Sequence, residues 1–152
     1  MAKSITGDRK PANRRASSRK GGAVKRRWRD YRTEAGRRPV AEALDGLSDD
    51  DAASVIAAMA DVRDRGLEAA RHLQDEIWEV RADGDRVIYR VLFATQGARS
   101  QILLALEAFE KKTQKTHPAK ITLAKRRLRD WKRRGVEKKR RAASQARSGR
   151  DR

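Results

Sequence analysis

The chain has 152 residues, no cysteine and a formal net charge of +18. Its length allows one domain with its own core plus terminal segments, and the lack of cysteine excludes disulfides and thiolate metal sites. No apolar run approaches the roughly 20 residues of a membrane span, and no apolar segment follows the basic N-terminus as it would in a secretory signal. We therefore expect a cytoplasmic protein with no membrane partner.

The charge is distributed unevenly along the chain. The net charge is +10 over residues 1–29, −7 over residues 30–110 and +15 over residues 111–152. Two basic ends around an acidic body indicate a polyanionic partner, and nucleic acid is the commonest one. The alternative is that both ends are solvated tails. The second basic block begins inside sequence with the pattern of folded elements, which favours the polyanion.

Composition divides the chain into three parts. Residues 1–23 are rich in Ser, Gly, Lys and Arg and poor in large apolar residues, so we expect a disordered basic extension. Residues 135–152 have a similar composition and are interpreted as a basic C-terminal tail, with at most a fraying helix. The folded domain is predicted over residues 24–134.

The first elements are a strand and two helices. The run "VKRRWRDYR" predicts a strand with Trp28 in the core. Pro39 and Gly46 then delimit a short helix, "RRPVAEALDGL". The segment "LSDDDAASVIAAMADVRDRG" predicts a longer helix, capped by Ser48 and ended by Gly66. Its predicted buried stripe is Val55, Ile56, Met59 and Val62.

Two β-type runs, "EIWEVRA" and "RVIYRVLF", flank the turn signal "DGD". A turn at Asp83 and Gly84 would pair Val80 with Val87 on an apolar face. The opposite, polar face would then hold Glu79, Arg81, Arg86 and Arg90. In that register Arg81 and Arg90 lie about four residues apart along the strands, or roughly 13 Å.

The last elements are a strand, "SQILLALEAF", and a helix, "HPAKITLAKRRLRDWKRR". The residues of that helix predicted to face inward are Ile121, Ala124, Leu128 and Trp131. The order is thus β-α-α-β-β-β-α. It predicts an α+β fold with a small, mostly antiparallel sheet, an N-terminal helix pair and a C-terminal helix.

The runs "IWEVR", "IYRVLF" and "ALEAFEKKTQKTHPAKITLAKRRLRDW", in this order and spacing, resemble the HigB-like toxins of phage-derived type in the RelE/ParE superfamily. The similarity covers roughly residues 28–131, and the block "FEKKTQKT…P…AKRRL" is its most specific part. The basic N-terminal extension is not part of the pattern. The resemblance implies a RelE-like fold and a toxin of a type II toxin–antitoxin system. Such a toxin is an endoribonuclease that cleaves mRNA, often on the ribosome, and so inhibits translation.

The chemistry that fits is attack of a ribose 2′-hydroxyl on the adjacent phosphate, which leaves a 2′,3′-cyclic phosphate. Preorganised cations stabilise the negative charge that develops on the phosphate. No cofactor or metal is needed, and two histidines without cysteine supply no metal-ligand cluster. The resemblance places Arg90 at the position of a phosphate-binding arginine, and Arg81 shares its predicted face. The alternative for either arginine is a surface residue or a structural ion pair.

Lysines at the end of the last strand complete the predicted site. Lys112 is preferred narrowly over Lys111 as the catalytic lysine, while Lys111, Lys115 and Arg86 are predicted to contact RNA. Glu79 occupies the position where some superfamily members keep a basic residue, so it is a candidate catalytic carboxylate, or alternatively the partner in a salt bridge. His117 has a suitable pKa for a general base but could instead open the last helix. The general base and general acid both stay open.

Two other functions remain possible on this sequence. The related ParE branch shares the fold and inhibits DNA gyrase without cleaving RNA. A non-catalytic basic nucleic-acid-binding protein would explain the charge, although the aromatic residues mostly fit core positions rather than a base-stacking surface. The implied partners of a HigB-like toxin are mRNA, the ribosome and a small helix-turn-helix antitoxin of the HigA type.

Overall fold

The computed structural model describes residues 24–112 and 114–150, and the expected N-terminal extension lies outside them. A single five-stranded sheet has the strand order β1-β5-β4-β3-β2. Its strands are β1 Arg27–Asp30, β2 Arg71–Gln74, β3 Ile77–Asp83, β4 Ile88–Gln96 and β5 Ile102–Glu110. The helices are α1 Pro39–Asp45, α2 Asp49–Arg65, the 3-10 turn η2 Leu67–Ala69, and α3 Pro118–Arg150. Only β1 pairs in parallel, with β5, so the predicted α+β fold with a mostly antiparallel sheet is confirmed.

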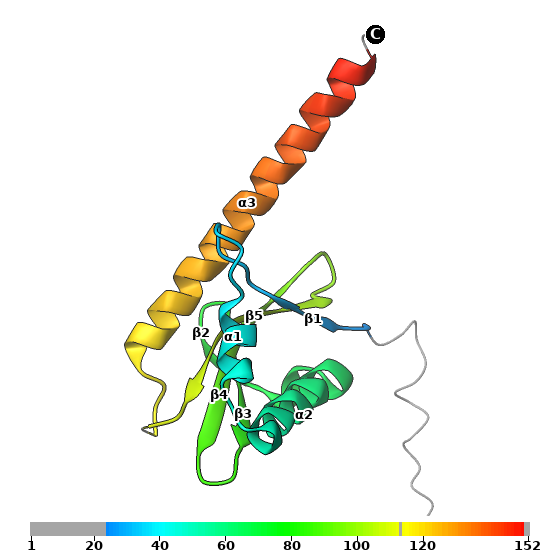
Figure 1. Ribbon diagram of the computed structural model, residues 1–152. Helices are drawn as coiled ribbons and strands as arrows, with labels where there is room; N and C mark the ends of the chain where they lie inside the picture. Colours follow the sequence, from blue (N-terminus) through cyan, green and yellow to red (C-terminus); the bar gives the residue numbers. More distant parts are fainter. Residues whose placement is uncertain (1–23, 113, 151–152) are drawn as a thin grey trace, which may run out of the picture.

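The sheet is covered on both faces, and each face has its own core. One core joins α1 and α2 to the sheet through Val40, Val55 and Met59, which pack on Val91 and Phe93. The other core joins α3 to the opposite face. Its buried members are Tyr31, Ile77, Leu92, Ala94, Leu104, Leu106, Ala124 and Leu128. The face predicted to be polar is therefore itself largely under α3 (Figure 1).

Helices α1 and α2 begin and end at the predicted residues. Pro39 occupies the first turn of α1, and the Ser48 side chain accepts a hydrogen bond of 3.2 Å from the Asp51 backbone N–H at the start of α2. Gly66 ends α2 with a φ of +88°, a value that favours glycine. Ile56 is 57% exposed, so its predicted place in the buried stripe is wrong. The buried residues of α2 are Val55, Met59 and Val62.

α3 runs without a break from Pro118 to Arg150, through the segment interpreted as a tail. Ala124 and Leu128 are buried against the sheet, as predicted, and Ile121 and Trp131 are half-buried. Beyond residue 136 every described residue of the helix is exposed. This end of α3 projects away from the body of the molecule (Figure 1). No helix in the described residues is long and apolar enough to span a membrane.

The β3–β4 hairpin has a longer loop than predicted. Asp83 pairs with Ile88, and the Gly84 N–H donates to the Val87 carbonyl at 2.8 Å across a four-residue loop. Val80 therefore pairs with Val91 instead of Val87, a shift of four residues. The shift is even, so Glu79, Arg81 and Arg90 keep their predicted face. The prediction for Arg86 is wrong, because this residue lies in the loop between the strands. The predicted separation of roughly 13 Å is wrong, because Arg81 lies directly opposite Arg90.

The edge strand β2 was not predicted. Its four residues, "RHLQ", are mostly exposed and show no apolar alternation. The strand forms because it pairs with β3, with His72 opposite Trp78 and a ring-centroid distance of 5.2 Å between them. The observed order thus contains one strand more than the predicted β-α-α-β-β-β-α.

Candidate functional site

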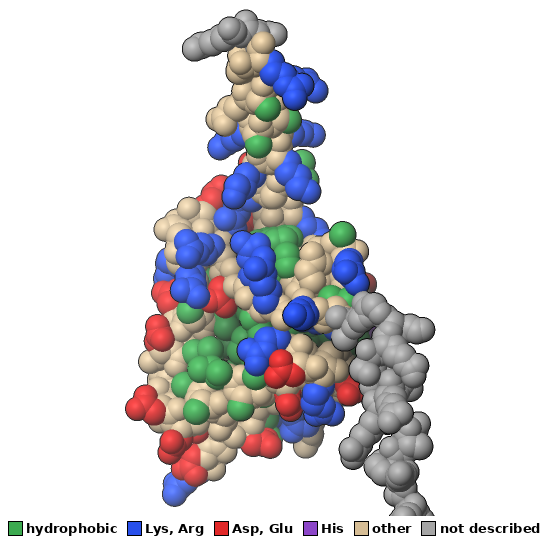
Figure 2. All heavy atoms as spheres, turned by 90° about the vertical axis from the view of Figure 1, so that its right-hand side faces the viewer, with side chains coloured by type: hydrophobic (Ala, Val, Ile, Leu, Met, Phe, Trp, Pro, Cys, Tyr) green, Lys and Arg blue, Asp and Glu red, His purple; other side chains and the backbone are tan. Residues whose placement is uncertain are grey.

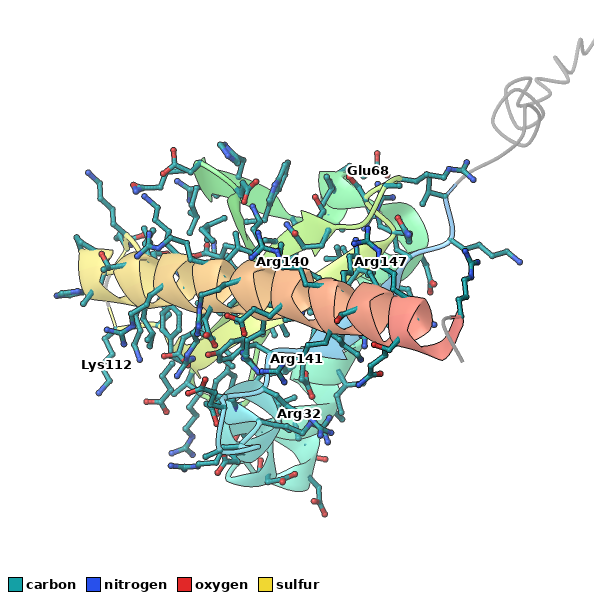
Figure 3. The ribbon with its side chains drawn as sticks, turned by 90° about the horizontal axis from the view of Figure 1, so that it is seen from above. Arg32, Glu68, Lys112, Arg140, Arg141 and Arg147 are labelled. Atoms are coloured by element: carbon teal, nitrogen blue, oxygen red, sulfur yellow. The ribbon has the colours of Figure 1, made fainter. Side chains whose placement is uncertain are left out.

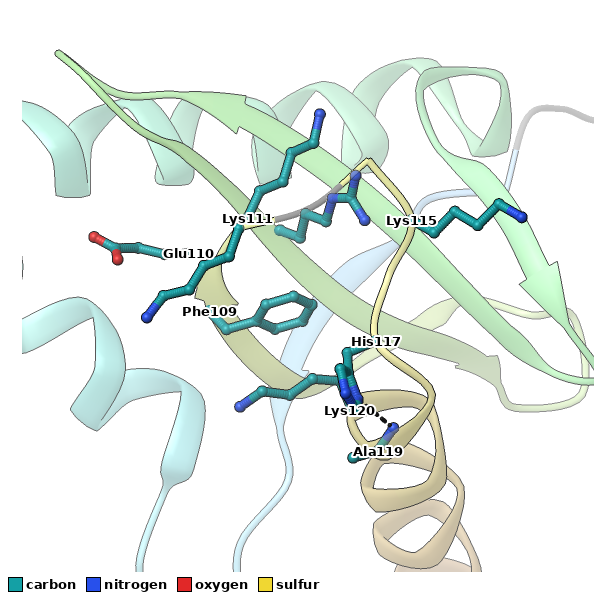
Figure 4. A pocket seen from close by; sticks show the side chains of 9 residues that line it. Phe109, Glu110, Lys111, Lys115, His117, Ala119 and Lys120 are labelled. Atoms are coloured by element: carbon teal, nitrogen blue, oxygen red, sulfur yellow. Dashed lines mark hydrogen bonds between the residues drawn. The ribbon is translucent and has the colours of Figure 1, made fainter.

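A pocket of about 450 Å³ lies where β5 ends and α3 begins (Figure 4). Its lining joins the last residues of β5, the connecting segment and the first turn of α3 to one residue of β4. The lining residues are Arg90, Phe109, Glu110, Lys111, Lys112, Lys115, His117, Ala119 and Lys120. Four of the seven predicted site residues are in this set. The lining contains five cationic side chains and one carboxylate, Glu110.

Arg90 forms the floor of the pocket and is 2% exposed. Its Nη1 donates to Thr116 Oγ1 at 2.5 Å, and its Nη2 donates to the Gln114 carbonyl at 2.7 Å. The same Nη1 lies 3.4 Å from Glu79 Oε2. The side chain is on the predicted face of β4, but the segment between β5 and α3 lies over it. Arg90 is therefore enclosed by its partners rather than exposed on an open surface.

Glu79 lies beneath the pocket and does not line it. It is 1% exposed, and its Oε2 accepts a hydrogen bond from the Thr116 hydroxyl as well as the ion pair with Arg90. Of the two roles considered from the sequence, this geometry corresponds to the salt bridge. Thr116, which connects both charged groups, was missed, because a threonine in a basic loop gives no signal until the loop is placed over the sheet.

Lys111 is the pocket lysine whose pKa is lowered by its surroundings. Its N–H donates to the Ile88 carbonyl at 2.6 Å, so its backbone extends the β4–β5 ladder beyond Glu110. Partial burial, and then the positive charges of Arg81 and Arg90, lower the pKa of the Lys111 ammonium. Arg81 itself is exposed beside the pocket. Because it lies opposite Arg90 in the ladder, both arginines act on the same lysine.

A second hollow of about 470 Å³ adjoins the first. Arg86 and Gln114 line it, and it shares Lys111 and Lys112 with the first pocket. Lys112 is exposed between the two hollows. Lys115 lines the first pocket, but Figure 4 shows its side chain directed away from the Phe109 ring. The structure thus gathers Arg81, Arg86 and all three predicted lysines around one end of the sheet.

Five lining residues were not predicted as site residues, and among them His117 had been left open: Phe109, Glu110, His117, Ala119 and Lys120. Lys120 Nζ lies 5.2 Å from the centroid of the Phe109 ring and 3.0 Å from Glu107 Oε2. The His117 ring is exposed, and its Nδ1 accepts a hydrogen bond of 3.0 Å from the Ala119 N–H (Figure 4). In that arrangement the neutral ring carries its proton on Nε2. In this arrangement the Nε2–H of His117 can donate a hydrogen bond, and Nε2 is not available as a base.

Within residues 24–112 and 114–150, no group of three or more His, Asp or Glu side chains is placed to hold a metal ion. The charged groups of the pocket instead form a cationic basin with an apolar ring at its centre. Arginine and lysine side chains of this kind bind phosphate groups through charge-assisted hydrogen bonds. The charge of the pocket thus suits a phosphate-bearing ligand.

The comparison with known families agrees with this geometry. Residues 42–129 match the family model described as phage derived protein Gp49-like (DUF891). The matched residues include α2, β2 to β5 and the first turns of α3. No curated protein shows significant similarity to the chain. The Gp49-like family is a RelE/HigB-type toxin family, and membership in it implies an antitoxin partner. More than half of the chain is matched, so the protein belongs to the phage-derived Gp49-like family of RelE/HigB-type toxins.

Proposed function

We propose that this chain is the toxin of a type II toxin–antitoxin system and cleaves mRNA at the pocket between β5 and α3. The observation that carries the proposal is the pairing of a lysine of lowered pKa, Lys111, with two arginines that lie opposite each other in the sheet. A lysine in this environment can lose its proton more readily than an ordinary surface lysine. The surrounding cations match the phosphates of an RNA strand.

In the proposed reaction, Lys111 takes the proton of a ribose 2′-hydroxyl. The 2′-oxygen then attacks the adjacent phosphorus, the bond from phosphorus to the 5′-oxygen of the next nucleotide breaks, and a 2′,3′-cyclic phosphate forms. The leaving 5′-oxygen takes a proton from water, which would produce a 5′-hydroxyl end, and the Nε2–H of His117 can donate a hydrogen bond to a phosphate oxygen. Apart from water, the proposed reaction uses only groups that the protein supplies.

The arginines stabilise the negative charge that develops on the phosphate. Arg81 is exposed and can reach a phosphate directly. Arg90 contributes positive charge from the floor of the pocket, because both of its terminal nitrogens already donate to Thr116 and Gln114. A direct contact between Arg90 and a phosphate requires displacement of the segment Gln114–Thr116. Glu79 holds Arg90 in place and is assigned no proton transfer.

Lys112, Lys115 and Arg86 are proposed to bind phosphates on either side of the cleaved bond, because they lie along the rims of the two adjoining hollows. The expected setting is the ribosome, where such toxins of the superfamily act on mRNA, and the inhibitor is expected to be a small helix-turn-helix protein of the HigA type. An acidic inhibitor surface placed over Lys111, Lys112 and Arg81 would block the pocket by charge pairing.

The test is expression of the wild-type chain and of a Lys111→Gln variant, with mapping of mRNA ends. We expect the wild type to produce fragments with 2′,3′-cyclic phosphate and 5′-hydroxyl ends, and Lys111→Gln to lower the cleavage rate by about 10²-fold or more. Lys112→Gln removes the same charge from the neighbouring, exposed position and serves as the matched control. A smaller loss is expected for this control, because Lys112 is assigned to binding.

Two results would contradict the proposal. If growth stops while mRNA stays intact and DNA gyrase is inhibited, the chain acts like the ParE branch. If the purified chain binds RNA but leaves it uncut, with and without ribosomes, it is a binding protein. Equal cleavage by wild type and Lys111→Gln would remove Lys111 from the mechanism without removing the activity.

A further inference from the structure

A third hollow, of about 820 Å³, lies away from these two, between the outer edge of β1, the segment that follows it and the middle of α3. We call it the β1 groove. Five cations line it, together with two half-buried tryptophans and one carboxylate, Asp30. The cations are Arg29, Arg32, Arg38, Arg134 and Lys138. It shares no lining residue with the pocket described above.

Most of the positive charge of the β1 groove is not neutralised. Asp30 is paired with Arg38, and Arg134 is held by Asp130 at 2.8 Å. The remaining three cations, Arg29, Arg32 and Lys138, are exposed and make no ion pair with any other residue that the structure describes. Figure 2 shows this side of the molecule, where Lys and Arg side chains gather at the base of the projecting helix. The groove therefore offers net positive charge to a ligand.

The face of α3 that lines the groove stays polar and basic beyond the body of the domain. Arg134, Lys138 and Arg141 follow one another at spacings of four and three residues, so they lie on one face of the helix. Figure 3 shows Arg141 on the side of α3 toward Arg32, with Arg140 and Arg147 on the other side. Arg134 and Arg141 are about 10 Å apart along the axis. A row of this kind suits an extended polyanion better than a single small anion.

The shape of the groove allows a ligand to approach the helix closely. Gly135 stands in its wall, and a Cβ there would meet no atom within 4 Å. Glycine inside a helix costs about 1 kcal/mol relative to alanine, and packing within the chain does not require it here. Trp131, half-buried beside Gly135, supplies an aromatic surface among the cations. Cations interleaved with aromatic rings are typical of surfaces that bind single-stranded nucleic acid.

We infer that the β1 groove is a second RNA-binding site, which holds the backbone of a single-stranded RNA segment outside the cleavage pocket. The inference rests on the proposed function only in choosing RNA as the polyanion. Arg29, Arg32 and Lys138 bind phosphates, Trp131 contacts a base, and Arg141 extends the track along α3. Along the helix, Lys120 in the cleavage pocket and Lys138 in the groove are 18 residues apart, or about 27 Å. An RNA strand bound at both sites is thus held at two well-separated points.

The test is binding of a fluorescently labelled single-stranded RNA oligonucleotide to the full-length chain as a function of salt. The oligonucleotide carries 2′-O-methyl riboses, which remove the nucleophile and keep it intact. The groove variant is Arg29→Gln/Arg32→Gln/Lys138→Gln. The matched control is Arg71→Gln/Arg99→Gln/Arg129→Gln, which removes three exposed cations that line neither hollow. Thermal unfolding confirms that both variants are folded.

We expect the groove variant to bind about tenfold or more weakly and to lose about two units of the slope of log affinity against log salt, since each lost phosphate contact removes about 0.7. The control should change neither quantity by a comparable amount. We also expect ultraviolet crosslinking to attach the RNA to the peptide that contains Trp131. Equal binding by the groove variant and the control overturns the inference.

The outcome is separable from that of the proposed cleavage. Loss of RNA binding by the groove variant, in a chain that cuts no RNA, supports the groove and refutes the cleavage. Normal binding with normal cleavage refutes the groove alone. If the groove variant keeps its RNA affinity but no longer co-purifies with an antitoxin, the groove is a protein-docking surface and the inference is wrong.

Discussion

Arg90 and Glu79 form an ion pair of 3.4 Å between Nη1 and Oε2, and the side chains are 2% and 0% exposed. The Thr116 hydroxyl donates to the same carboxylate oxygen and accepts from the same guanidinium nitrogen. Glu79 Oε1 and Arg90 Nε are buried and have no hydrogen-bond partner within the described part of the chain. The charged floor of the pocket is thus a closed, desolvated unit, and its integrity affects both stability and the field at Lys111.

The first prediction concerns the loss of one partner of this pair. Arg90→Ala leaves the Glu79 carboxylate buried without its counter-charge, which should lower the free energy of unfolding by about 3–5 kcal/mol. Arg81→Ala, the exposed arginine directly opposite, should change it by less than about 0.5 kcal/mol. Urea unfolding followed by circular dichroism measures both. Equal stability of the two variants would mean that Arg90 is not buried as described.

Thr116 provides a second, milder test of the same unit. Thr116→Val keeps the shape but removes the hydroxyl, so the hydrogen bonds with Glu79 and Arg90 are lost, at a cost of about 1–3 kcal/mol. Thr116→Ser retains the hydroxyl and should recover most of the stability. Chemical denaturation of the three proteins decides the point. A serine variant as unstable as the valine variant would assign the effect to the lost methyl group.

The pH dependence of cleavage tests the proposed base. The pKa of Lys111 is lowered by burial and by Arg81 and Arg90, and in the proposed reaction the deprotonated form acts as the base. The cleavage rate should therefore rise with pH and level off at a pH below the ordinary lysine pKa of 10.5. Arg81→Gln removes one of the cations that disfavour the ammonium, so the rising limb should move to higher pH.

The control for that shift is Arg99→Gln, an exposed charge that lines neither hollow of the site. It should leave the midpoint of the pH profile unchanged. If Arg81→Gln lowers the maximal rate but leaves the midpoint in place, Arg81 binds phosphate without tuning Lys111. The pH profile therefore distinguishes the two contributions of one residue.

The hydrogen bond between Tyr89 of β4 and Asp51 of α2 should make the stability depend on pH. The Tyr89 hydroxyl donates to Asp51 Oδ2 at 2.7 Å, and this hydrogen bond, with burial, raises the pKa of Tyr89 to about 12. The unfolded state loses the phenolic proton above about pH 10, whereas the folded state keeps it. The stability from this bond is therefore fully present below pH 10 and is lost as the pH rises toward 12. Urea midpoints across this range should fall more steeply for wild type than for Tyr89→Phe.

The partner prediction follows from family membership. A toxin that cleaves mRNA requires an inhibitor made with it, and we expect a neighbouring reading frame that encodes a small helix-turn-helix protein. Co-expression should restore growth, and the two chains should co-purify in a salt-sensitive manner. Arg81→Glu/Lys112→Glu should weaken the complex if the inhibitor covers the cleavage pocket. An unchanged complex would place the inhibitor elsewhere on the toxin.

Local patterns predicted the helices and the class of fold well. Pro39, Ser48 and Gly66 act on the backbone of their own segment, so their effect is visible in the sequence. Alternation along β3 and β4 also assigned Glu79, Arg81 and Arg90 to one face correctly. Lys111 and Lys112 were placed near the site because a basic run directly followed a strand.

Tertiary contacts account for what the patterns missed. The "DGD" turn was predicted as a two-residue turn, but Asp51 of α2 accepts from the Asp85 N–H at 2.8 Å and holds a wider loop. Gly84 is required there for space, since a Cβ would lie 2.7 Å from the Tyr89 ring. Likewise, the burial of Arg90 depends on where residues 114–116 cross the sheet, which no periodicity encodes. The strand β2 depends on β3 in the same way.

The parallel pairing of β1 with β5 has a consequence for synthesis of the protein. Residues 27–30 reach their hydrogen-bonding partners only after residues 102–105 have been made, and Leu92 and Leu104 are covered only once α3 follows. A nascent chain therefore cannot complete its sheet before β5 has been made, or its second core before the first turns of α3 have been made. Because the cationic pocket is assembled from the end of β5 and the start of α3, ribosome-bound fragments that stop before residue 118 are incomplete toxins. The candidate pocket thus forms only after the start of α3 has been synthesised, so an inhibitor that covers this pocket finds its binding surface only on chains that extend past that point.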